Sequence, residues 1–225
     1  VAHIEGGDYT EGGTLDDSVR HAMTKLAHLH FTTNAQAAER VEKLGEEPWR
    51  IHNVGLTVLD LAEEGKFASP DEVEISLKID AGRPTVLFCQ HSVTTEYGSV
   101  DDQITPSLVA LEELAGQGYQ IIITYPNNDA GGQRIIRQIE DFGRKGLPGV
   151  TVRKSLGRYL YHGVLNAIGR IGLGCCAGNS SSGIKETPFF GCPVVNIGTR
   201  QQGRLRAANV TDAPYDSGTI VSAIK

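Results

Sequence analysis

Acidic and basic side chains near the start of the chain could transfer protons. In the segment HIEGG, Glu5 lies at the end of a strand-like run, beside two glycines that allow a ligand to approach the backbone. Asp16, Asp17 and Arg20 follow within a short span, at the start of a predicted helix. Acids gathered at a strand end and a helix start can act as general acid and base. For Asp16 and Arg20, which are one helical turn apart, the alternative is an ordinary ion pair.

The segment GNSSSGIKE, from Gly178 to Glu186, follows an apolar strand-like run and opens a predicted helix. Free backbone N–H groups at that helix start, together with the hydroxyls of Ser180 and Ser181, would suit a phosphate. We expect Glu186 in the early turns of the same helix, where its carboxylate could accept hydrogen bonds from a ribose diol. This combination indicates a nucleotide. The alternative is a serine-rich turn that only caps a helix.

Further candidate binding residues follow other predicted strands. His91 comes directly after TVLFCQ, and the loop PNNDAGG follows YQIIITY. A histidine there could donate to a diphosphate oxygen or exchange a proton with a leaving group. Alternatively, it is a partly buried histidine bonded to loop carbonyls. Arg200, after PVVNIGT, is either a phosphate-binding arginine or an ordinary solvated one.

Composition and missing motifs exclude several function classes. The 225 residues carry a formal net charge of -6, so no sequence-wide positive field is present to bind nucleic acid or an anionic membrane. The serine-hydrolase motif G-x-S-x-G and the NTPase loop G-x-x-x-x-G-K-[ST] are both absent from the sequence. His28 and His30 have no Cys or carboxylate at metal-ligand spacing, and we expect neither a metal ion nor a cofactor.

The cysteines and the ends of the chain indicate its compartment. Cys89, Cys175, Cys176 and Cys192 lie in or beside apolar runs and form no C-x-x-C pair, so we expect buried thiols in a reducing cytoplasm. No signal-peptide core or bilayer-length apolar run occurs, which predicts a soluble cytoplasmic protein. The chain opens at Val1 within a strand-like segment and without Met, and we expect that an upstream part has been removed.

Elements that must position these residues alternate along the chain. Short apolar runs and amphipathic helical stretches follow one another, which predicts an α/β fold with doubly wound parallel sheets. A polar, turn-rich stretch from Gly65 to Pro70 indicates a boundary between residues 1–66, the remainder of one Rossmann-like domain, and a second Rossmann-like domain at 67–225. Ligands of such sheets bind beyond the carboxyl ends of the strands.

Individual elements can be placed from their caps and apolar runs. After the opening strand, Thr14 and Asp17 indicate a helix from Leu15, Asn34 caps a second helix, and RIHNVG forms a strand. Ser69 followed by proline begins the first helix beyond the boundary. The second domain then has strands at TVLFCQ, YQIIITY, GVTVRKS, IGLGCCAG and PVVNIG, and helices near 100–117, 131–145, 156–170 and 183–190.

Taken together, these motifs resemble one enzyme family. HIEGG, GTLDDSVRHAMTKLAHLHF, QHSVTTE, PNNDAGG, GNSSSGIKE and FFGCPVVNIGTRQQGR occur in the order and spacing of the hydrolysing UDP-N-acetylglucosamine (UDP-GlcNAc) 2-epimerases of sialic acid synthesis. The resemblance covers nearly the whole chain. It implies a glycosyltransferase-B-like architecture of two doubly wound domains with the nucleotide sugar between them, the first domain being incomplete here. We expect the start of the usual chain and its last helix to be missing.

The resemblance also assigns roles by position. It places Glu5, Asp16 and His91 where the family has catalytic groups, with Asp17 and Arg20 as close support. It implies that UDP is bound by Asn127, Ser155, Ser180, Ser181, Glu186 and Arg200. The reaction would convert UDP-GlcNAc and water to N-acetylmannosamine and UDP through a glycal. Either Glu5 or Asp16 would be the base, with His91 stabilising the departing phosphate.

Several alternatives stay open. The chain could belong to a non-hydrolysing epimerase that returns UDP to the glycal, or it could act on a UDP-diacetamido-trideoxyhexose. It could also be a nucleotide-sugar-binding fragment without turnover. Unpaired sheet edges in an incomplete domain favour self-association, so we expect a homodimer or homotetramer.

Overall fold

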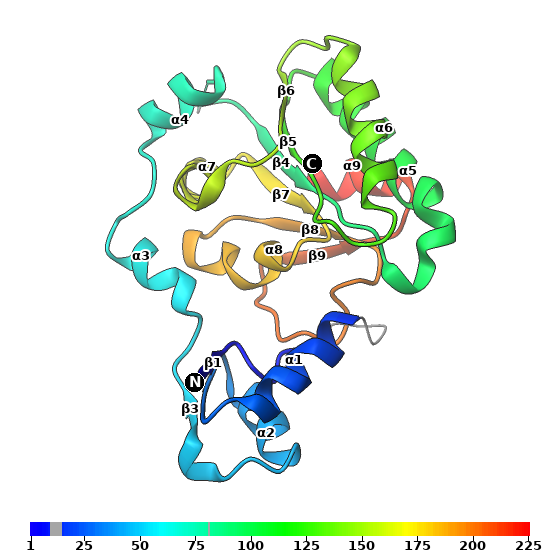
Figure 1. Ribbon diagram of the computed structural model, residues 1–225. Coiled ribbons are helices and arrows are strands. Elements are labelled where there is room, and N and C mark those ends of the chain that lie inside the picture. Colours follow the sequence, from blue (N-terminus) through cyan, green and yellow to red (C-terminus); the bar gives the residue numbers. More distant parts are fainter. Residues whose placement is uncertain (10–14, 81) are drawn as a thin grey trace. The chain divides into compact units, whose positions relative to one another are not determined.

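The structure, a computed structural model, describes residues 1–9, 15–80 and 82–225. These residues divide into two compact units (Figure 1). The first unit contains residues 1–64 and 202–204, and the second contains residues 65–201 and 205–225. Thr14, the expected cap of the first helix, lies outside the described residues.

The first unit is built on a three-stranded parallel sheet in the order β1-β2-β3. Its strands are β1 (Ala2–Ile4), β2 (Leu29–Thr32) and β3 (Ile51–Asn53). Its helices are α1 (Leu15–Leu26), α2 (Ala35–Lys43) and α3 (Asp60–Glu63), with 3-10 turns at Pro48–Arg50 and Thr57–Leu59. The predicted start of α1 at Leu15 is confirmed. The cap of α2 is also confirmed, because the Asn34 side chain accepts a hydrogen bond from the Ala37 N–H at 2.9 Å.

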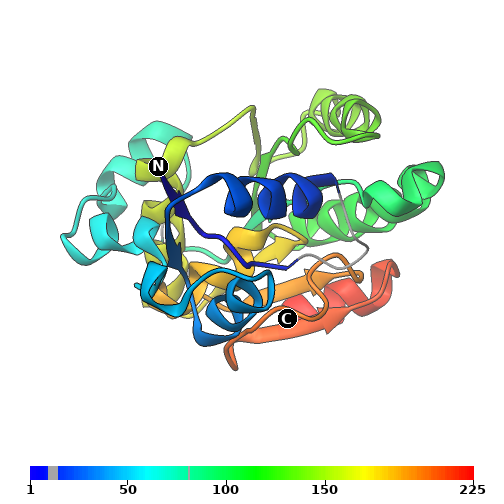
Figure 2. The same cartoon turned by 60° about the horizontal axis from the view of Figure 1, so that its bottom comes forward.

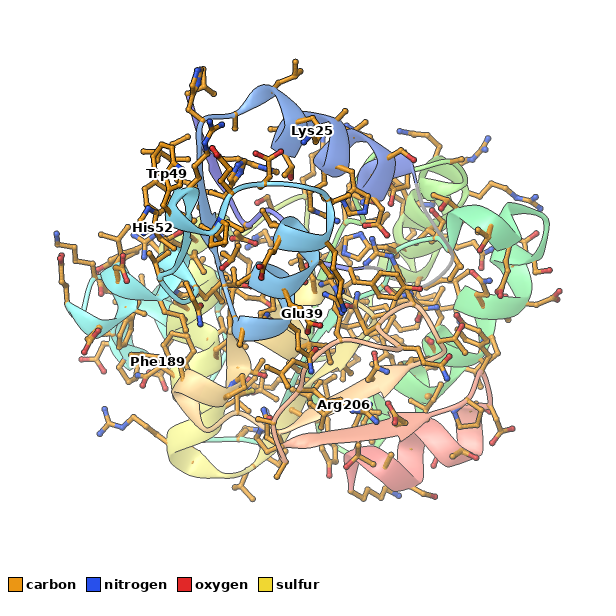
Figure 3. All side chains as sticks on the ribbon, turned by 90° about the horizontal axis from the view of Figure 1, so that it is seen from below. Lys25, Glu39, Trp49, His52, Phe189 and Arg206 are labelled. Atoms are coloured by element: carbon orange, nitrogen blue, oxygen red, sulfur yellow. The ribbon has the colours of Figure 1, made fainter. Side chains whose placement is uncertain are left out.

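Polar residues occupy much of the interior of the first unit. In β2 the two buried positions are His30 and Thr32. The His30 Nε2 atom lies 3.1 Å from one carboxylate oxygen of Glu46. The other oxygen of Glu46 accepts a hydrogen bond from Lys25 Nζ at 2.5 Å. Lys25 belongs to α1 and is labelled in Figure 3. Buried polar groups of this kind are stable only when they are paired, so β2 and α1 are joined by specific hydrogen bonds.

The second unit is a six-stranded parallel sheet in the order β6-β5-β4-β7-β8-β9. Its strands are β4 (Thr85–Cys89), β5 (Gln120–Thr124), β6 (Val150–Arg153), β7 (Gly174–Gly178), β8 (Val194–Ile197) and β9 (Val210–Ala213). Its helices are α4 (Pro70–Leu77), α5 (Val100–Gly116), α6 (Gly132–Arg144), α7 (Gly157–Ile171), α8 (Ser181–Lys185) and α9 (Ser217–Ile224), with 3-10 turns at Thr94–Ser99 and Thr187–Phe190. This is a doubly wound α/β arrangement, as predicted.

Helices cover both faces of this sheet (Figure 1). On one face, α5, α6 and α9 bury the apolar core together with alternate residues of the strands, among them Phe88 and Ile121. Figure 2 shows α9 (red) next to α5 (green). On the other face lies α7, and α4 packs against α7. The predicted start of α4 is confirmed by a capping box between Ser69 and Glu72.

One predicted helix, at 183–190, is wrong in its bounds. The α-helix α8 ends at Lys185, and a 3-10 turn, Thr187–Phe190, follows. Pro188 has no N–H to donate to the carbonyl four residues earlier, so an α-helix cannot continue unbroken through it. Glu186 is consequently the C-terminal cap of α8 and does not lie in its early turns.

All four cysteines are free and buried, as predicted. None of the helices in the described ranges combines the length and apolar composition of a membrane-spanning segment.

Candidate functional site

The strand order of the second unit places a ligand-binding position between β4 and β7. From β4 the chain proceeds outward to β5 and β6, whereas β7 starts a second series on the opposite side of β4. In doubly wound sheets, ligands bind where the two series diverge, outside the carboxyl ends of the strands. The loops after β4 and β7 carry His91 and the GNSSS segment, so the candidate residues lie at this point.

His91 and Asn179 are connected directly across this position. The His91 N–H donates to Asn179 Oδ1 at 2.6 Å, and Asn179 Nδ2 donates to the His91 carbonyl at 2.9 Å. β7 approaches closely enough because Gly178 has φ +121° and no side chain, and a Cβ there would lie 2.0 Å from the Cys89 carbonyl oxygen. The buried Asn179 side chain therefore fixes the relative position of the two loops.

The His91 ring has a defined protonation state. Its Nδ1 atom accepts from the Asn127 N–H at 3.0 Å, and a backbone amide can only donate. The proton of the neutral ring is therefore on Nε2, which lies 3.5 Å from Cys89 Sγ. Burial, and next the charge of Arg200, lower the pKa of His91 from 6.5 to about 4, so the ring is neutral at physiological pH.

Arg200 is held beside these loops by acceptors from two of them. Its Nη1 donates to the Asn179 carbonyl at 3.2 Å, and its Nη2 lies 3.7 Å from Asp129 Oδ2. Asp129 also accepts from Asn127 Nδ2 at 2.6 Å. Gln201 Nε2 donates to the same Asn179 carbonyl at 2.7 Å. With 11% of its side chain exposed, the Arg200 guanidinium is a mostly desolvated cation suited to an anionic ligand.

The serine hydroxyls form a chain that the helix itself does not use. Ser180 is the N-cap of α8, but its side chain makes no capping hydrogen bond. Instead, its Oγ lies 2.9 Å from Ser182 Oγ, which in turn lies 2.6 Å from the Tyr161 hydroxyl. Because α8 has only five residues, few peptide dipoles add up along it, so an anion at this position would interact more with the side-chain hydroxyls than with the helix dipole.

Glu186 is fixed by a histidine of α7. His162 is fully buried, and its Nε2 lies 2.7 Å from Glu186 Oε2. The Glu186 side chain is 17% exposed, so it remains accessible to a ligand. Ser155, by contrast, is an exposed residue after β6 whose hydroxyl accepts from the Gly157 N–H at 3.1 Å. Its hydrogen bond shapes the start of α7 and does not connect it to the residues around His91.

In the first unit, Glu5 has an unusual backbone. Its φ is +64°, in the left-handed region that non-glycine residues rarely adopt. Strain of this kind often occurs at functional sites. The Glu5 N–H donates to the Phe31 carbonyl at 2.9 Å, which holds the residue at the end of β1, and its side chain is partly exposed.

The loop after Glu5 is held by arginines of the same unit. Arg40 donates to the Gly7 carbonyl at 3.1 Å, Arg20 to the Asp8 carbonyl at 3.3 Å, and Arg204 to the Tyr9 carbonyl at 2.7 Å. Successive carbonyls are thus each bound by a different guanidinium, and the loop that follows Glu5 is rigidly positioned.

The two neighbouring acids of α1 have different surroundings. Asp17 is buried and accepts from Arg20, whereas Asp16 is exposed in the first turn. Among the described residues, Arg20 therefore forms its ion pair with Asp17. The pair between Asp16 and Arg20 that their spacing suggested is not formed in the part of the chain that the structure describes. Asp17 and Arg20 support the helix start, and Asp16 is left accessible to solvent.

Comparison with known proteins identifies the family. The family model described as UDP-N-acetylglucosamine 2-epimerase matches residues 1–225. The chain belongs to the UDP-N-acetylglucosamine 2-epimerase family. It is 33% identical over 228 residues to a UDP-N-acetylglucosamine 2-epimerase of Neisseria meningitidis, covering 100% of this chain and 56% of the relative. It is 31% identical over 213 residues to the hydrolysing GDP/UDP-N,N'-diacetylbacillosamine 2-epimerase of Campylobacter jejuni, covering 95% of this chain and 53% of the relative.

Solved structures of this family have the same fold. The Neisseria meningitidis UDP-GlcNAc 2-epimerase bound to UDP-GlcNAc superposes with a TM-score of 0.72 at 15% identity, covering 99% of this chain and 60% of that one. The Methanocaldococcus jannaschii UDP-GlcNAc 2-epimerase in complex with UDP-GlcNAc and UDP superposes with a TM-score of 0.70 at 14% identity, covering 99% of this chain and 60% of that one. The chain spans about half the length of the curated epimerases it matches.

Several residues around the candidate site were not singled out from the sequence. Asn179, Asp129 and Ser182 lie within the quoted motifs, and Asn179 could have been chosen as the first polar residue after an apolar strand. Tyr161 and His162 lie in a helix that carried no motif, so no local pattern pointed to them.

Groups of three or more metal-ligating side chains do not occur among the described residues.

Proposed function

We propose that the protein containing this chain is a hydrolysing UDP-GlcNAc 2-epimerase, which converts UDP-GlcNAc and water to N-acetylmannosamine and UDP. The observation that carries this proposal is the junction of His91, Asn179 and Arg200 at the divergence of the two strand series. A mostly desolvated cation and a serine hydroxyl that does not cap α8 are carried by loops at the strand ends, where α/β sheets bind nucleotides.

Binding of UDP divides among the residues of the second unit. Arg200 and the hydroxyls of Ser180 and Ser181 bind the diphosphate, and Glu186 accepts hydrogen bonds from the ribose hydroxyls. Asn127 and the Ser155 backbone line the remainder of the uridine site. Support comes from the shared location of the loops that carry Asn127, Ser180 and Arg200, which all follow the carboxyl ends of strands of one sheet.

The reaction proceeds by elimination and then hydration. The bond between C1 and the diphosphate oxygen breaks with its electron pair leaving on UDP, while a carboxylate removes the C2 proton, and the C1–C2 double bond of a glycal forms. Water then adds, with hydroxyl at C1 and a proton at C2, and gives the free sugar. Glu5 and Asp16 are the candidate acid and base. The strained backbone of Glu5 and the solvent-exposed position of Asp16 are compatible with these roles.

His91 stabilises the departing UDP as a neutral donor. Its proton on Nε2 faces the thiol of Cys89, which is a weak acceptor, so a phosphate oxygen can replace the sulfur at little cost. Because the ring stays neutral, it contributes a directed hydrogen bond and not a full positive charge.

The test is product analysis with the natural protein. Incubation with UDP-GlcNAc should release UDP and free N-acetylmannosamine, detected by NMR. Glu5→Gln and Asp16→Asn should each lower turnover roughly 100-fold or more, the range for general acid–base groups, while UDP affinity stays unchanged. Turnover within a few-fold of the parent in both variants would contradict the assignment, and failure to bind UDP would contradict the function.

A second substrate is favoured by specific relatives. Two of the curated relatives, from Campylobacter jejuni and Legionella pneumophila, are hydrolysing epimerases of N,N'-diacetylbacillosamine nucleotides and are each 31% identical to this chain. Both are named as hydrolysing, which supports the hydrolytic outcome over return of UDP to the glycal. A competition assay with UDP-GlcNAc and the UDP-diacetamido sugar, read as the ratio of kcat/KM, distinguishes the two substrates.

A further inference from the structure

Two neighbouring residues of α7 contact the two ends of the segment from Ser182 to Glu186. The Tyr161 hydroxyl lies 2.6 Å from Ser182 Oγ, and His162 Nε2 lies 2.7 Å from Glu186 Oε2. His162 is fully buried and Tyr161 is partly buried, and the His162 ring packs against Phe190, with ring centroids 5.1 Å apart. A single helix turn thus reaches the hydroxyls at one end and the carboxylate at the other.

The hydroxyl chain has a preferred proton order. Burial raises the pKa of Tyr161 well above its ordinary value, so the phenol keeps its proton and can donate it to Ser182. Ser182 can then donate to Ser180, 2.9 Å away, which leaves the Ser180 proton for an outside acceptor. An anion can only accept hydrogen bonds, and hydrogen bonds in such a chain polarise one another. The order that runs outward from Tyr161 is therefore the one that an anion selects.

The histidine acts on the carboxylate in a similar way. A carboxylate oxygen only accepts, so His162 must carry its proton on Nε2 and donate it to Glu186 Oε2. This bond restricts the Glu186 side chain and leaves Oε1 for another donor. His162 Nδ1 is buried and has no hydrogen-bond partner among the described residues. A histidine with only one of its nitrogens bonded is a costly choice for filling an apolar interior, where phenylalanine or leucine would pack without that cost.

We propose that Tyr161 and His162 are positioning residues for the nucleotide. Tyr161, through Ser182, directs the Ser180 hydroxyl proton at the diphosphate, and His162 orients Glu186 towards the ribose diol. This inference rests on the proposed UDP-binding function and deepens it, because it divides the support of the ligand between two adjacent side chains.

Ligand-selective losses test the inference. In the natural protein, dissociation constants are measured for UDP, for uridine, which has no phosphate, and for 2′,3′-dideoxy-UDP, which has no diol. Tyr161→Phe should weaken UDP about three- to tenfold, the worth of one hydrogen bond, and leave uridine unchanged. His162→Phe should weaken UDP by a similar factor and leave dideoxy-UDP unchanged. His162→Gln, which can place an amide N–H near the Nε2 position, should restore most of the UDP affinity.

Matched variants keep the test decisive if a buried substitution impairs folding. Ser182→Ala, at a partly exposed position, should reproduce the ligand pattern of Tyr161→Phe, and combining the two should add no further loss. If the parent protein binds UDP but the variants weaken all three ligands equally, or none of them, the positioning roles are refuted. If the parent does not bind UDP, the proposed function itself fails.

Discussion

His91 and Asn179 exchange two hydrogen bonds that run in opposite directions between the loops after β4 and β7. The distance from the His91 backbone nitrogen to Asn179 Oδ1 is 2.6 Å, and that from Asn179 Nδ2 to the His91 carbonyl oxygen is 2.9 Å. Asn179 is almost entirely buried. A backbone amide and a backbone carbonyl are thus both satisfied by one side chain at the candidate nucleotide site. The backbone carbonyl of Asn179 accepts hydrogen bonds from the side chains of Arg200 and Gln201.

Asn179→Ala should therefore reduce both stability and UDP binding. The substitution leaves the His91 N–H and carbonyl without their partner, and each unpaired buried group costs about 1–3 kcal/mol. We expect a loss of at least about 2 kcal/mol in the free energy of unfolding by urea, with a weaker UDP affinity measured by calorimetry. Asn128→Ala, at an exposed position of a neighbouring loop, is the control and should change neither quantity.

Lowering the pH should destabilise the protein through His91. Its folded pKa is about 4, whereas the unfolded residue titrates near 6.5, so between these values the unfolded chain binds a proton that the folded chain does not. The free energy of unfolding therefore carries no penalty from His91 above pH 6.5, and it decreases as the pH falls from 6.5 towards 4. At pH 4.5 the loss should reach roughly 2–3 kcal/mol.

Urea unfolding at pH 7 and pH 4.5 measures this effect. His91→Asn is the matched variant, because its side-chain oxygen can replace Nδ1 as the acceptor for the Asn127 N–H. This variant should lack the part of the pH dependence that His91 causes. Equal losses in parent and variant would show that other groups account for the acid sensitivity.

Backbone strain at Glu5 should be measurable as stability. Glycine tolerates the left-handed conformation, so Glu5→Gly should be about 0.5–1 kcal/mol more stable than Glu5→Ala, and on the proposed function both should lower turnover as Glu5→Gln does. Lys78, with φ +56°, has the same backbone conformation at the end of α4. The pair Lys78→Gly and Lys78→Ala should show the same difference while retaining activity. A larger difference at Glu5 alone would indicate strain beyond the φ angle.

Close contact between β7 and β4 makes Gly178 intolerant of a side chain. Gly178→Ala would place a Cβ 2.0 Å from the Cys89 carbonyl at φ +121°, and we expect a loss of about 3 kcal/mol or more in thermal or urea unfolding. Gly146 also has a positive φ, but a Cβ there meets nothing within 4 Å. Gly146→Ala should cost only about 1 kcal/mol, and equal costs at the two glycines would contradict the steric explanation.

The cysteines should be unreactive until the protein unfolds. Burial raises the pKa of Cys192 to about 12 and also raises the pKa of the other three thiols, so almost no thiolate is present at neutral pH. Iodoacetamide should label none of them in the time that labels all four in urea. Rapid native labelling of Cys89 in particular would show that the loop after β4 opens more readily than its hydrogen bonds suggest.

Apolar runs and caps were sufficient to predict most of the second unit. The strands β4 and β5 are buried at every position and α4 has its predicted cap, so local pattern and tertiary structure agree there. In the first unit the same holds for the predicted cap of α2. Such segments specify their structure locally.

Other elements carry no such pattern. In β2 the buried positions are His30 and Thr32, while Leu29 and Phe31 are partly exposed, so polar and apolar positions are reversed relative to an ordinary half-buried strand. β9 is a four-residue edge strand with only Ala213 buried. Neither strand could be recognised from hydrophobicity, because pairing with neighbouring strands determines them.

Candidate binding residues were predictable where they follow a strand directly. His91, Ser180 and Arg200 could be selected by that rule, since parallel strands end at the same edge. Tyr161 and His162 could not, because they act across the space between α7 and α8, and their partners are 21 and 24 residues away in sequence. Only the tertiary structure brings these side chains together.

The pairing of β4 with β7 also has a kinetic consequence. These adjacent strands are separated in sequence by β5, α5, α6, β6 and α7, so their contact closes a long loop, whereas β4 with β5 and β5 with β6 close shorter ones. Loop closure of this kind is entropically expensive and slows folding. During refolding, the helices and the paired strands β4, β5 and β6 can form first, and the candidate nucleotide site should form only in the last cooperative step. Ligand binding would then report completion of the native state, later than circular dichroism does.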